Sequence, residues 1–276
     1  MKRWDLYSML EIGRKLFAKM HKRKQRAHHN HELHFMAREL DQWLPEGIQS
    51  LITGTYSLRH LRRFYFKDEM VDQLHPSDRI LQHLLLKQLK PTFSKVMNPN
   101  CYHLNGPSGV GHATQRIRQV LEKKNPSYII RVDVKSFYKS IFHYKLLEGL
   151  RQYYDDPKLL TMLGNIITNP IETPRGYKNS GHGIALRGPL SQFFSGIYLK
   201  PLDDAFNLMN VDYIRYQDDI LILCQTKRQF NRCRRRLMAV LKERRLTISR
   251  KKSRMGCINT GFHFLGIHYI GTQPQH

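Results

Sequence analysis

The stretch Val211-Asp212-Tyr213-Ile214-Arg215-Tyr216-Gln217-Asp218-Asp219-Ile220-Leu221-Ile222-Leu223-Cys224 sets the polar tetrapeptide Tyr216 to Asp219 between two short apolar runs. Apolar runs on either side of a short polar segment predict a β-hairpin, here with Asp218 and Asp219 at its tip. Two adjacent carboxylates repel each other and lose hydration unless a cation offsets their charge. The hairpin therefore predicts a site for a divalent metal ion.

A second apolar run, Tyr128 to Val134, predicts a buried strand that carries Asp133 at its C-terminal end. Metal-dependent phosphoryl transfer uses carboxylates from separate strands to hold two cations roughly 3.5–4 Å apart. Taken alone, Asp133 is also typical of a turn at a strand end, and Asp218 of a solvated hairpin tip. Both motifs in one chain favour a phosphoryl-transfer site.

A series of short blocks resembles the reverse transcriptase family in its order, from about Gly54 to Ile270. The block from Asp133 to Tyr138 resembles the first catalytic block of that family, and Tyr216 to Asp219 resembles its signature box. The other matching blocks are Asp78 to Gln82 and Leu89 to Phe93 in the fingers, Arg187 to Gln192 for template and nucleotide, Leu246 to Ser253 around a lysine, and Phe264 to Gly266 in the primer grip.

The resemblance implies an α+β fold, with right-hand polymerase fingers and palm, an antiparallel palm sheet and a helical N-terminal extension. Ten residues follow Gly266 in the 276-residue chain, so we expect the thumb to be absent or minimal. The expected domains are a basic helical extension over 1–53, fingers over 54–128, a palm over 129–270 with a fingers-like insertion at about 145–183, and a tail over 271–276.

The activity that the resemblance implies is that of an RNA-directed DNA polymerase, which adds deoxynucleotides to a primer by two-metal phosphoryl transfer. Asp133, Asp218, Asp219 and the Val134 carbonyl would hold two Mg²⁺ ions, with Mn²⁺ as an alternative, and Lys252 would give charge or a proton to pyrophosphate. The residues expected at the nucleotide are Phe137, Tyr138, Gly188, Gln192, Arg62, Arg63 and Arg79, and the expected primer grip is Phe264, Leu265 and Gly266.

Tyr138 favours deoxynucleotides, because an aromatic side chain at this position of the family crowds the 2′ carbon of the sugar. Two alternatives stay open, namely a catalytically idle palm used as an RNA-binding or assembly subunit and an RNA-directed RNA polymerase. The three carboxylates oppose the first alternative and Tyr138 opposes the second. The ending Ser191-Gln192 resembles the enzymes of diversity-generating retroelements, and the short chain also resembles phage-defence groups; the sequence does not choose between them.

The composition predicts a polyanionic partner. With 46 Lys and Arg against 22 Asp and Glu, the formal charge is +24, which an RNA template and a DNA product would offset. Residues 227–252 form the most basic segment and predict an amphipathic helix with an apolar stripe on the palm sheet and a phosphate-contacting outer face. We also expect a noncoding RNA or a protein partner that supplies the missing thumb.

The four cysteines show no Cys-x-x-Cys spacing, and the first apolar stretch is too interrupted for a signal or membrane segment. These features predict a reduced, cytosolic protein without a membrane partner, and the resemblance implies that the cytoplasm is bacterial.

Overall fold

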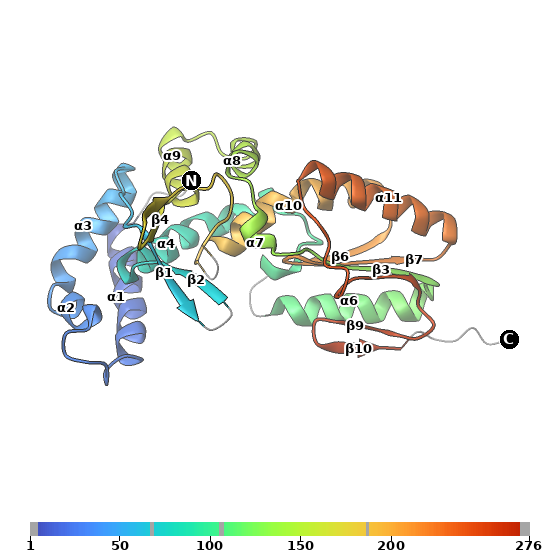
Figure 1. Cartoon of the computed structure of the whole chain (residues 1–276), viewed down its shortest axis with the longest axis horizontal. Helices are drawn as coiled ribbons and strands as arrows, with labels where there is room; N and C mark the ends of the chain where they lie inside the picture. The colour runs from blue at the N-terminus through green and yellow to red at the C-terminus, as the bar shows by residue number, and fades with distance from the viewer. Residues whose placement is uncertain (1–4, 67–68, 105–107, 186–187, 271–276) are drawn as a thin grey trace. The chain divides into compact units, whose positions relative to one another are not determined.

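The computed structural model describes residues 5–66, 69–104, 108–185 and 188–270. The chain divides into two compact units. Unit 1 comprises Met1–Phe93 and Phe142–Ser191, and unit 2 comprises Ser94–Ile141 and Gln192–His276 (Figure 1). Each unit contains a four-stranded sheet, so the α+β class with antiparallel sheet pairing is confirmed.

Unit 1 combines helices with a sheet of strand order β2-β1-β4-β5. Strand β1 pairs antiparallel with β2 and, over a short stretch, parallel with β4. The elements are α1 (Leu6–Lys22), α2 (Glu32–Arg38), α3 (Leu40–Thr53), β1 (Leu61–Phe66), β2 (Glu69–Gln73), α4 (Pro76–Leu89), η1 (Lys90–Thr92), α8 (His143–Arg151), α9 (Pro157–Ile167), β4 (Ile171–Thr173) and β5 (Gly176–Lys178).

Local sequence signals explain where two of these helices begin. Helix α9 follows Asp156, whose side chain accepts hydrogen bonds from the first backbone N–H groups, and Pro157 fits the first turn. Helix α4 likewise begins with Pro76. Its apolar face, which includes the fully buried Ile80 and Leu85, forms part of the core of unit 1.

Unit 2 contains an antiparallel sheet with the strand order β6-β7-β3-β8. A separate two-stranded hairpin is formed by β9 and β10. The elements are η2 (Tyr102–Leu104), α6 (Gly109–Lys124), β3 (Tyr128–Asp133), α7 (Phe137–Ser140), β6 (Asp212–Tyr216), β7 (Asp219–Cys224), α11 (Lys227–Glu243), β8 (Arg254–Cys257), β9 (Phe262–Phe264) and β10 (Ile267–Tyr269), with α5 (Phe93–Val96) and α10 (Ser191–Leu208) each starting on the last residue of a unit 1 segment.

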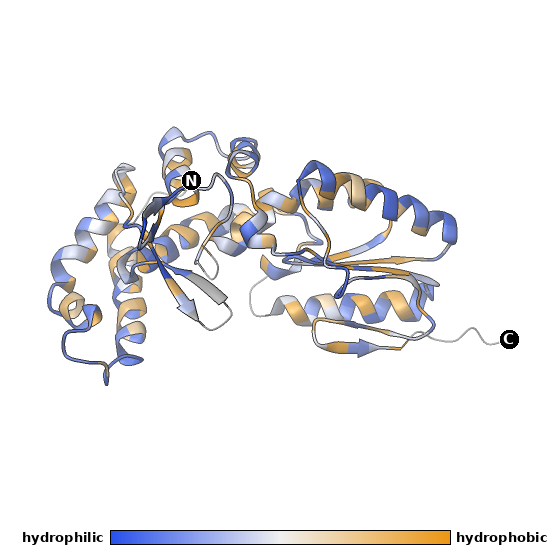
Figure 2. Ribbon diagram, viewed as in Figure 1, coloured by the Kyte–Doolittle hydropathy of each residue, from blue (hydrophilic) through white to orange (hydrophobic). Residues whose placement is uncertain are grey.

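The unit 2 sheet is covered on both faces. Ile129 of β3 and Leu221 and Leu223 of β7 join a buried cluster with α6 and the β9–β10 hairpin. On the other face, the ring of Tyr128 contacts that of Phe230 in α11, with centroids 5.5 Å apart. Figure 1 shows α6 and α11 on opposite sides of the sheet, and Figure 2 shows the apolar strands between them. Alternate residues of β3 and β7 therefore face different helices.

The predicted domain boundaries stay a prediction, and the two units group the chain differently. Residues 94–128, expected in the fingers, belong to the unit that holds the large antiparallel sheet, because α6 packs on that sheet. Residues 145–183, expected as a fingers-like insertion, belong to the same unit as residues 54–93. In the described part of the chain, no helix combines the length and apolar character needed to cross a bilayer.

Candidate active site

The β6–β7 hairpin carries two of the three predicted catalytic carboxylates. Its last paired residues are Tyr216 and Asp219, so Gln217 and Asp218 form the turn. Gln217 has a φ of 56°, in the left-handed region that two-residue hairpin turns use. The strand pairing therefore places Asp218 in the turn and Asp219 at the first position of the returning strand.

Asp133 lies directly opposite Asp219, because the β3–β7 register pairs these two residues. Residues opposite each other in an antiparallel ladder have Cβ atoms about 4.5–5.5 Å apart, so like charges at such positions repel. The sheet thus brings Asp133 and the Asp218-Asp219 pair, from segments far apart in the sequence, to the same end of one sheet.

The pKa values of Asp218 and Asp219 are both raised. Burial raises the pKa of Asp218 to about 6, and the charges of Asp219 and Asp133 add to this rise. Burial and the charge of Asp133 also raise the pKa of Asp219, although Arg131 and Lys252 act in the opposite direction. The surrounding protein therefore leaves part of the negative charge at this end of the sheet uncompensated.

Lys252 lies beside the carboxylates. Its Nζ is 4.0 Å from Oδ2 of Asp133, and its side chain is 70% exposed, so solvent screens this ion pair. Backbone contacts hold the segment next to β3: the N–H of Ser249 donates to the carbonyl of Asp133 at 2.8 Å, and the N–H of Asp133 donates to Ser253 Oγ at 3.2 Å. The exposed lysine therefore sits on an anchored segment.

The donor set at this site fits Mg²⁺. Magnesium sites that act on phosphates use one or two carboxylates and take their other oxygens from substrate and water. Among the described residues, no group of three or more His, Cys, Asp or Glu side chains is arranged as a metal site by the protein alone. Val134 and Ile248 form an antiparallel bridge in which the hydrogen bonds are made by neighbouring residues: the N–H of Lys135 donates to the Thr247 carbonyl, and the N–H of Ser249 donates to the Asp133 carbonyl. These bonds do not use the Val134 carbonyl, which leaves it as a further oxygen ligand. The uncompensated charge of the carboxylates supplies the attraction for a divalent cation.

A buried ion pair beneath the hairpin was not predicted from the sequence. Arg215 is fully buried and binds Asp203 of α10 through two hydrogen bonds, Nε to Oδ1 at 2.6 Å and Nη2 to Oδ2 at 2.5 Å. Burial acts to lower the pKa of Arg215, but the carboxylate of Asp203 raises it well above its ordinary value. The remaining Nη1 donates to the carbonyl of Gln217 at 3.0 Å, so the ion pair supports the turn.

His103 supports the same turn through the backbone N–H of Gln217, whereas Arg215 binds the carbonyl of that residue. The N–H of Gln217 donates to Nδ1 of His103 at 3.1 Å, and Nε2 lies 3.0 Å from the carbonyl of Gln192. Burial, together with the charge of Arg215, lowers the pKa of His103 to about 3, so the ring is neutral. A neutral ring that accepts at Nδ1 carries its proton on Nε2 and donates it to Gln192. Both ring nitrogens are therefore used in positioning.

Tyr138 approaches the turn through its side chain. Its hydroxyl donates to Oε1 of Gln217 at 3.3 Å, and its ring contacts that of the buried Phe137, with centroids 5.3 Å apart. Burial raises the pKa of Tyr138 to about 12, so the hydroxyl keeps its proton and acts as a donor. The aromatic residue expected at the nucleotide sugar is thus in the same unit as the carboxylates and bonded to their turn.

The predicted primer grip forms the β9–β10 turn. Phe264 is buried in the cluster beneath α6, whereas Leu265 and Gly266 form the turn with φ values of 52° and 78°. A two-residue turn with two positive φ angles favours glycine at its second position. Gln192, at the start of α10, has an exposed side chain and contributes its carbonyl to His103.

The other predicted nucleotide residues lie in unit 1. Arg63 makes two hydrogen bonds to the carboxylate of Asp72, at 2.7 and 2.9 Å, so its charge is already paired. Arg79 lies in α4. At Gly188 an added Cβ would lie 3.3 Å from the Ala185 carbonyl, which explains the small residue. The preceding Arg187, part of the predicted template block, falls outside the described residues.

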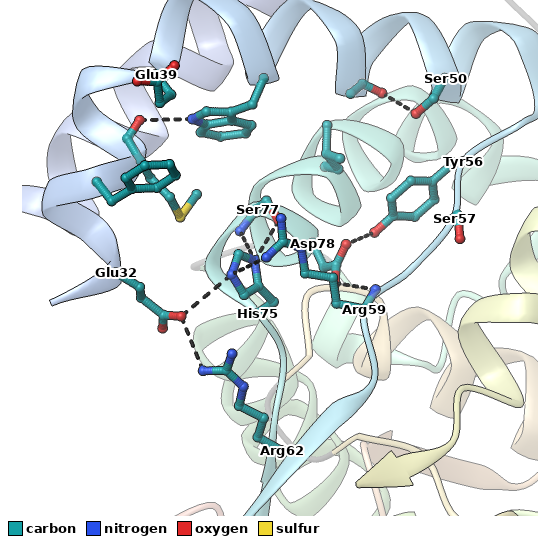
Figure 3. A pocket seen from close by; sticks show the side chains of 15 residues that line it. Glu32, Glu39, Ser50, Tyr56, Ser57, Arg59, Arg62, His75, Ser77 and Asp78 are labelled. Carbon is teal, nitrogen blue, oxygen red and sulfur yellow. Dashed lines mark hydrogen bonds and ion pairs between the residues drawn. The ribbon is translucent and has the colours of Figure 1, made fainter. Parts of the chain in front are cut away.

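Arg62 lines a pocket of about 420 Å³ in unit 1, shown in Figure 3. Its guanidinium lies 3.2 Å from the carboxylate of Glu32, which is also 3.5 Å from Nε2 of His75. Burial lowers the pKa of His75 to about 4. Every residue that lines the pocket belongs to unit 1.

Comparison with known proteins agrees with this geometry. The sequence model of a family described as "Reverse transcriptase (RNA-dependent DNA polymerase)" matches residues 70–269. Protein YkfC of Escherichia coli (strain K12) is 23% identical over 270 residues, which cover 82% of this chain and 71% of that protein.

Solved structures show the same fold at low identity. Telomerase from Candida tropicalis, truncated from its C-terminal domain, superposes with a TM-score of 0.53 at 12% identity over 69% of this chain. Telomerase from Candida albicans in complex with a fragment of telomeric RNA gives a TM-score of 0.52 at 14% identity over 69% of this chain. The matches span 43% and 37% of the telomerase chains, so this chain corresponds to less than half of each.

Proposed function

Because this chain belongs to the reverse transcriptase family, we propose that it is an active RNA-directed DNA polymerase, which adds deoxynucleotides to a primer by two-metal phosphoryl transfer. The observation that carries the proposal is the β3–β7 register, which sets Asp133 opposite Asp219 beside Asp218 in the turn. The raised pKa values of Asp218 and Asp219 support it, because they mark negative charge that a cation would offset.

Each residue has a defined part in this proposal. Asp133, Asp218, Asp219 and the Val134 carbonyl would hold two Mg²⁺ ions, and Asp219 would tune the field of the ions rather than bind both. When bound, the metal ions lower the pKa of the primer 3′-hydroxyl and neutralise the triphosphate. Lys252 is exposed and 4.0 Å from Asp133, so it is available to give charge or a proton to the leaving pyrophosphate.

Substrate selection rests on Tyr138. Its hydroxyl is bonded to the side chain of Gln217, which fixes the aromatic ring next to the turn that carries Asp218. A fixed ring next to the reacting sugar excludes a 2′-hydroxyl by steric contact, so deoxynucleotides are the proposed substrates. The proposed triphosphate contacts remain the exposed Arg62, its neighbour Arg63 and Arg79 of α4. The proposed template or nucleotide contacts remain Gly188 and Gln192.

Primer extension on an RNA template with Mg²⁺ tests the activity. Wild type and the Asp218→Ala variant are compared with deoxynucleotides and with ribonucleotides, and Asp155→Ala serves as a matched control because Asp155 is an exposed carboxylate in unit 1. We expect deoxynucleotide extension that is lost in Asp218→Ala and kept in the control. Ribonucleotide incorporation would instead indicate an RNA polymerase, and RNA binding without extension would indicate an idle palm.

We further propose that the enzyme works in the bacterial cytoplasm with a noncoding RNA or a protein partner, in a retroelement or in antiphage defence. The net charge of +24 supports an RNA component, because such an excess is offset most readily by a polyanion. Affinity purification from cells after treatment with or without ribonuclease tests this. A defined RNA that co-purifies and serves as template supports the proposal, and a protein free of RNA and of other chains contradicts it.

A further inference from the structure

Helix α11 places four of its exposed basic residues in one stripe. Arg228, Arg232, Arg235 and Lys242 are all exposed, and their spacing of four, three and seven residues puts them along one side of the helix. The opposite side carries the buried Cys233, Leu237, Val240 and Leu241. At 1.5 Å per residue, the stripe is about 21 Å long.

The stripe lies on the face of the sheet opposite to the one that is in phase with Asp133 and Asp219. Asp133 and Asp219 are odd-numbered residues of their strands, in phase with Ile129 and Leu221, which pack against α6. Helix α11 packs on the even-numbered residues, as the contact between Tyr128 and its own Phe230 shows. Figure 1 shows α6 and α11 on opposite sides of this sheet, so the stripe is on the face opposite to the one in phase with these two carboxylates.

The protein itself does not neutralise this charge. Within α11, Glu243 is the only acidic residue against seven Lys and Arg. None of the four stripe residues forms an ion pair with a carboxylate in the described part of the chain; Arg232 donates only to the carbonyl of Met209, at 3.4 Å. Figure 2 shows the helix largely blue, in keeping with a strongly polar outer surface.

The chemistry of the stripe matches a phosphate backbone. Three of its four members are arginines, whose planar guanidinium groups bind phosphate oxygens in pairs. Met238 is the only exposed large apolar residue of α11, so the helix lacks the apolar face that would insert into a membrane. No aromatic side chain of α11 is exposed, which removes the stacking platform that single strands use. These features favour a duplex.

We infer that this stripe of α11 is a second nucleic-acid site, which binds a helix of structured RNA distinct from the template–product duplex. The choice of RNA over DNA rests on the proposed function, because an enzyme that copies RNA meets RNA duplexes. A-form RNA presents phosphates and 2′-hydroxyls that proteins read by shape, and a basic helix surface is suited to that contact. The site would tether an RNA to the enzyme while the carboxylates act on the template.

The test is direct binding, which does not depend on polymerase activity. In the α11 variant, Arg228, Arg232, Arg235 and Lys242 are all changed to Gln. In the matched control, the exposed Lys19, Lys22, Arg23 and Arg26 are changed to Gln, which removes the same charge from unit 1. Fluorescence anisotropy measures the affinity of each full-length protein for a hairpin RNA, a duplex DNA of the same length and vesicles containing anionic lipid, over a range of salt concentrations.

We expect the α11 variant to bind the hairpin RNA at least tenfold more weakly than the control does. The slope of the logarithm of the binding constant against the logarithm of the salt concentration should fall in magnitude by about three to four, because each lost phosphate contact removes about 0.9. Extension of a short primer, if wild type extends it, should change by less than twofold. Circular dichroism checks the fold, and Arg235→Gln alone, with an expected loss of about threefold, provides a second variant if the fourfold one unfolds.

Unchanged RNA affinity in the α11 variant would overturn the inference, as would an equal loss in both variants, which indicates general charge attraction. Tighter binding of DNA than RNA, or a loss confined to vesicles, would also overturn it. Absence of polymerase activity with intact α11-dependent RNA binding would contradict the proposed function and leave the α11 site supported.

Discussion

The guanidinium of Arg215 donates a hydrogen bond to the carbonyl of Gln217 at 3.0 Å, which links a fully buried ion pair to the turn that carries Asp218. Arg215 is held in turn by Asp203, so the position of the turn depends on α10 as well as on its own two strands. Support from a buried, doubly bonded arginine fixes the backbone more firmly than the half-buried turn alone can, which is how a catalytic carboxylate is held in one geometry.

Arg215→Met should both destabilise the protein and reduce polymerase activity. It leaves the carboxylate of Asp203 buried without a cation, which costs about 3–5 kcal/mol of unfolding free energy. The double variant Arg215→Met, Asp203→Asn removes the unpaired charge and keeps an acceptor for the hydroxyl of Tyr213, which donates to Asp203 at 2.6 Å. Denaturant unfolding should show most of the stability restored, while primer extension stays at least tenfold low. Full activity in the double variant would show that Arg215 has no positioning role.

The raised pKa of Asp218 predicts a specific dependence on pH and Mg²⁺. Between its ordinary value of 3.8 and about 6, Asp218 in the folded protein binds a proton that it does not bind in the unfolded chain, so without metal the contribution of Asp218 to the unfolding free energy falls as pH rises through this window. Mg²⁺ binds the ionised carboxylate and therefore stabilises the protein more above this window than within it. Thermal unfolding with and without Mg²⁺ measures both effects.

The Asp218→Asn variant lacks this contribution, so the difference in unfolding free energy between wild type and variant should fall as pH rises across the window. The gain in stability from Mg²⁺ should be smaller in the variant. An Mg²⁺ effect of the same size in wild type and variant would show that the ion binds elsewhere.

Lys252 can be separated from its basic neighbours by mutation. Lys252→Ala should lower the rate of nucleotide addition by about 10²-fold, within the range of a lost general acid or its charge. Stability should change little, because the side chain is 70% exposed. Lys251→Ala, at a neighbouring exposed residue, is the matched control and should retain activity. Single-turnover addition measures the rate, and rescue by Lys252→Arg would assign a charge role, whereas failure of Arg would assign proton donation.

The pattern of the sequence predicted the parts of the fold that local periodicity governs. Alternating and apolar residues around Tyr216 to Asp219 predicted the hairpin, and the run that ends at Asp133 predicted a strand. The structure shows both, and their register then brings the carboxylates together. The amphipathic helix after the hairpin was also predictable, because Leu237, Val240 and Leu241 recur at helical spacing and are buried.

The supports of the turn were not predictable in the same way. Asp203 precedes Arg215 in another element, and His103 lies still further away in the chain, so neither forms a local pattern with the hairpin. The one available signal was a charged Arg215 inside an otherwise apolar strand, which indicates either an exposed edge or a buried partner. The face of the sheet that α11 covers was equally hidden, because it depends on the phase of two paired strands rather than on the helix itself.

Tyr138 should govern the choice between deoxynucleotides and ribonucleotides. Tyr138→Ala removes the ring and should raise ribonucleotide incorporation relative to deoxynucleotide incorporation by at least tenfold. Tyr138→Phe keeps the ring and deletes only the hydroxyl that donates to Gln217, so it should retain selectivity with a modest loss of rate. Steady-state extension with each nucleotide type measures the ratio of kcat/KM values. If Tyr138→Phe relaxes selectivity as much as Tyr138→Ala does, the hydroxyl and its bond to the turn, rather than the bulk of the ring, determine the choice of sugar.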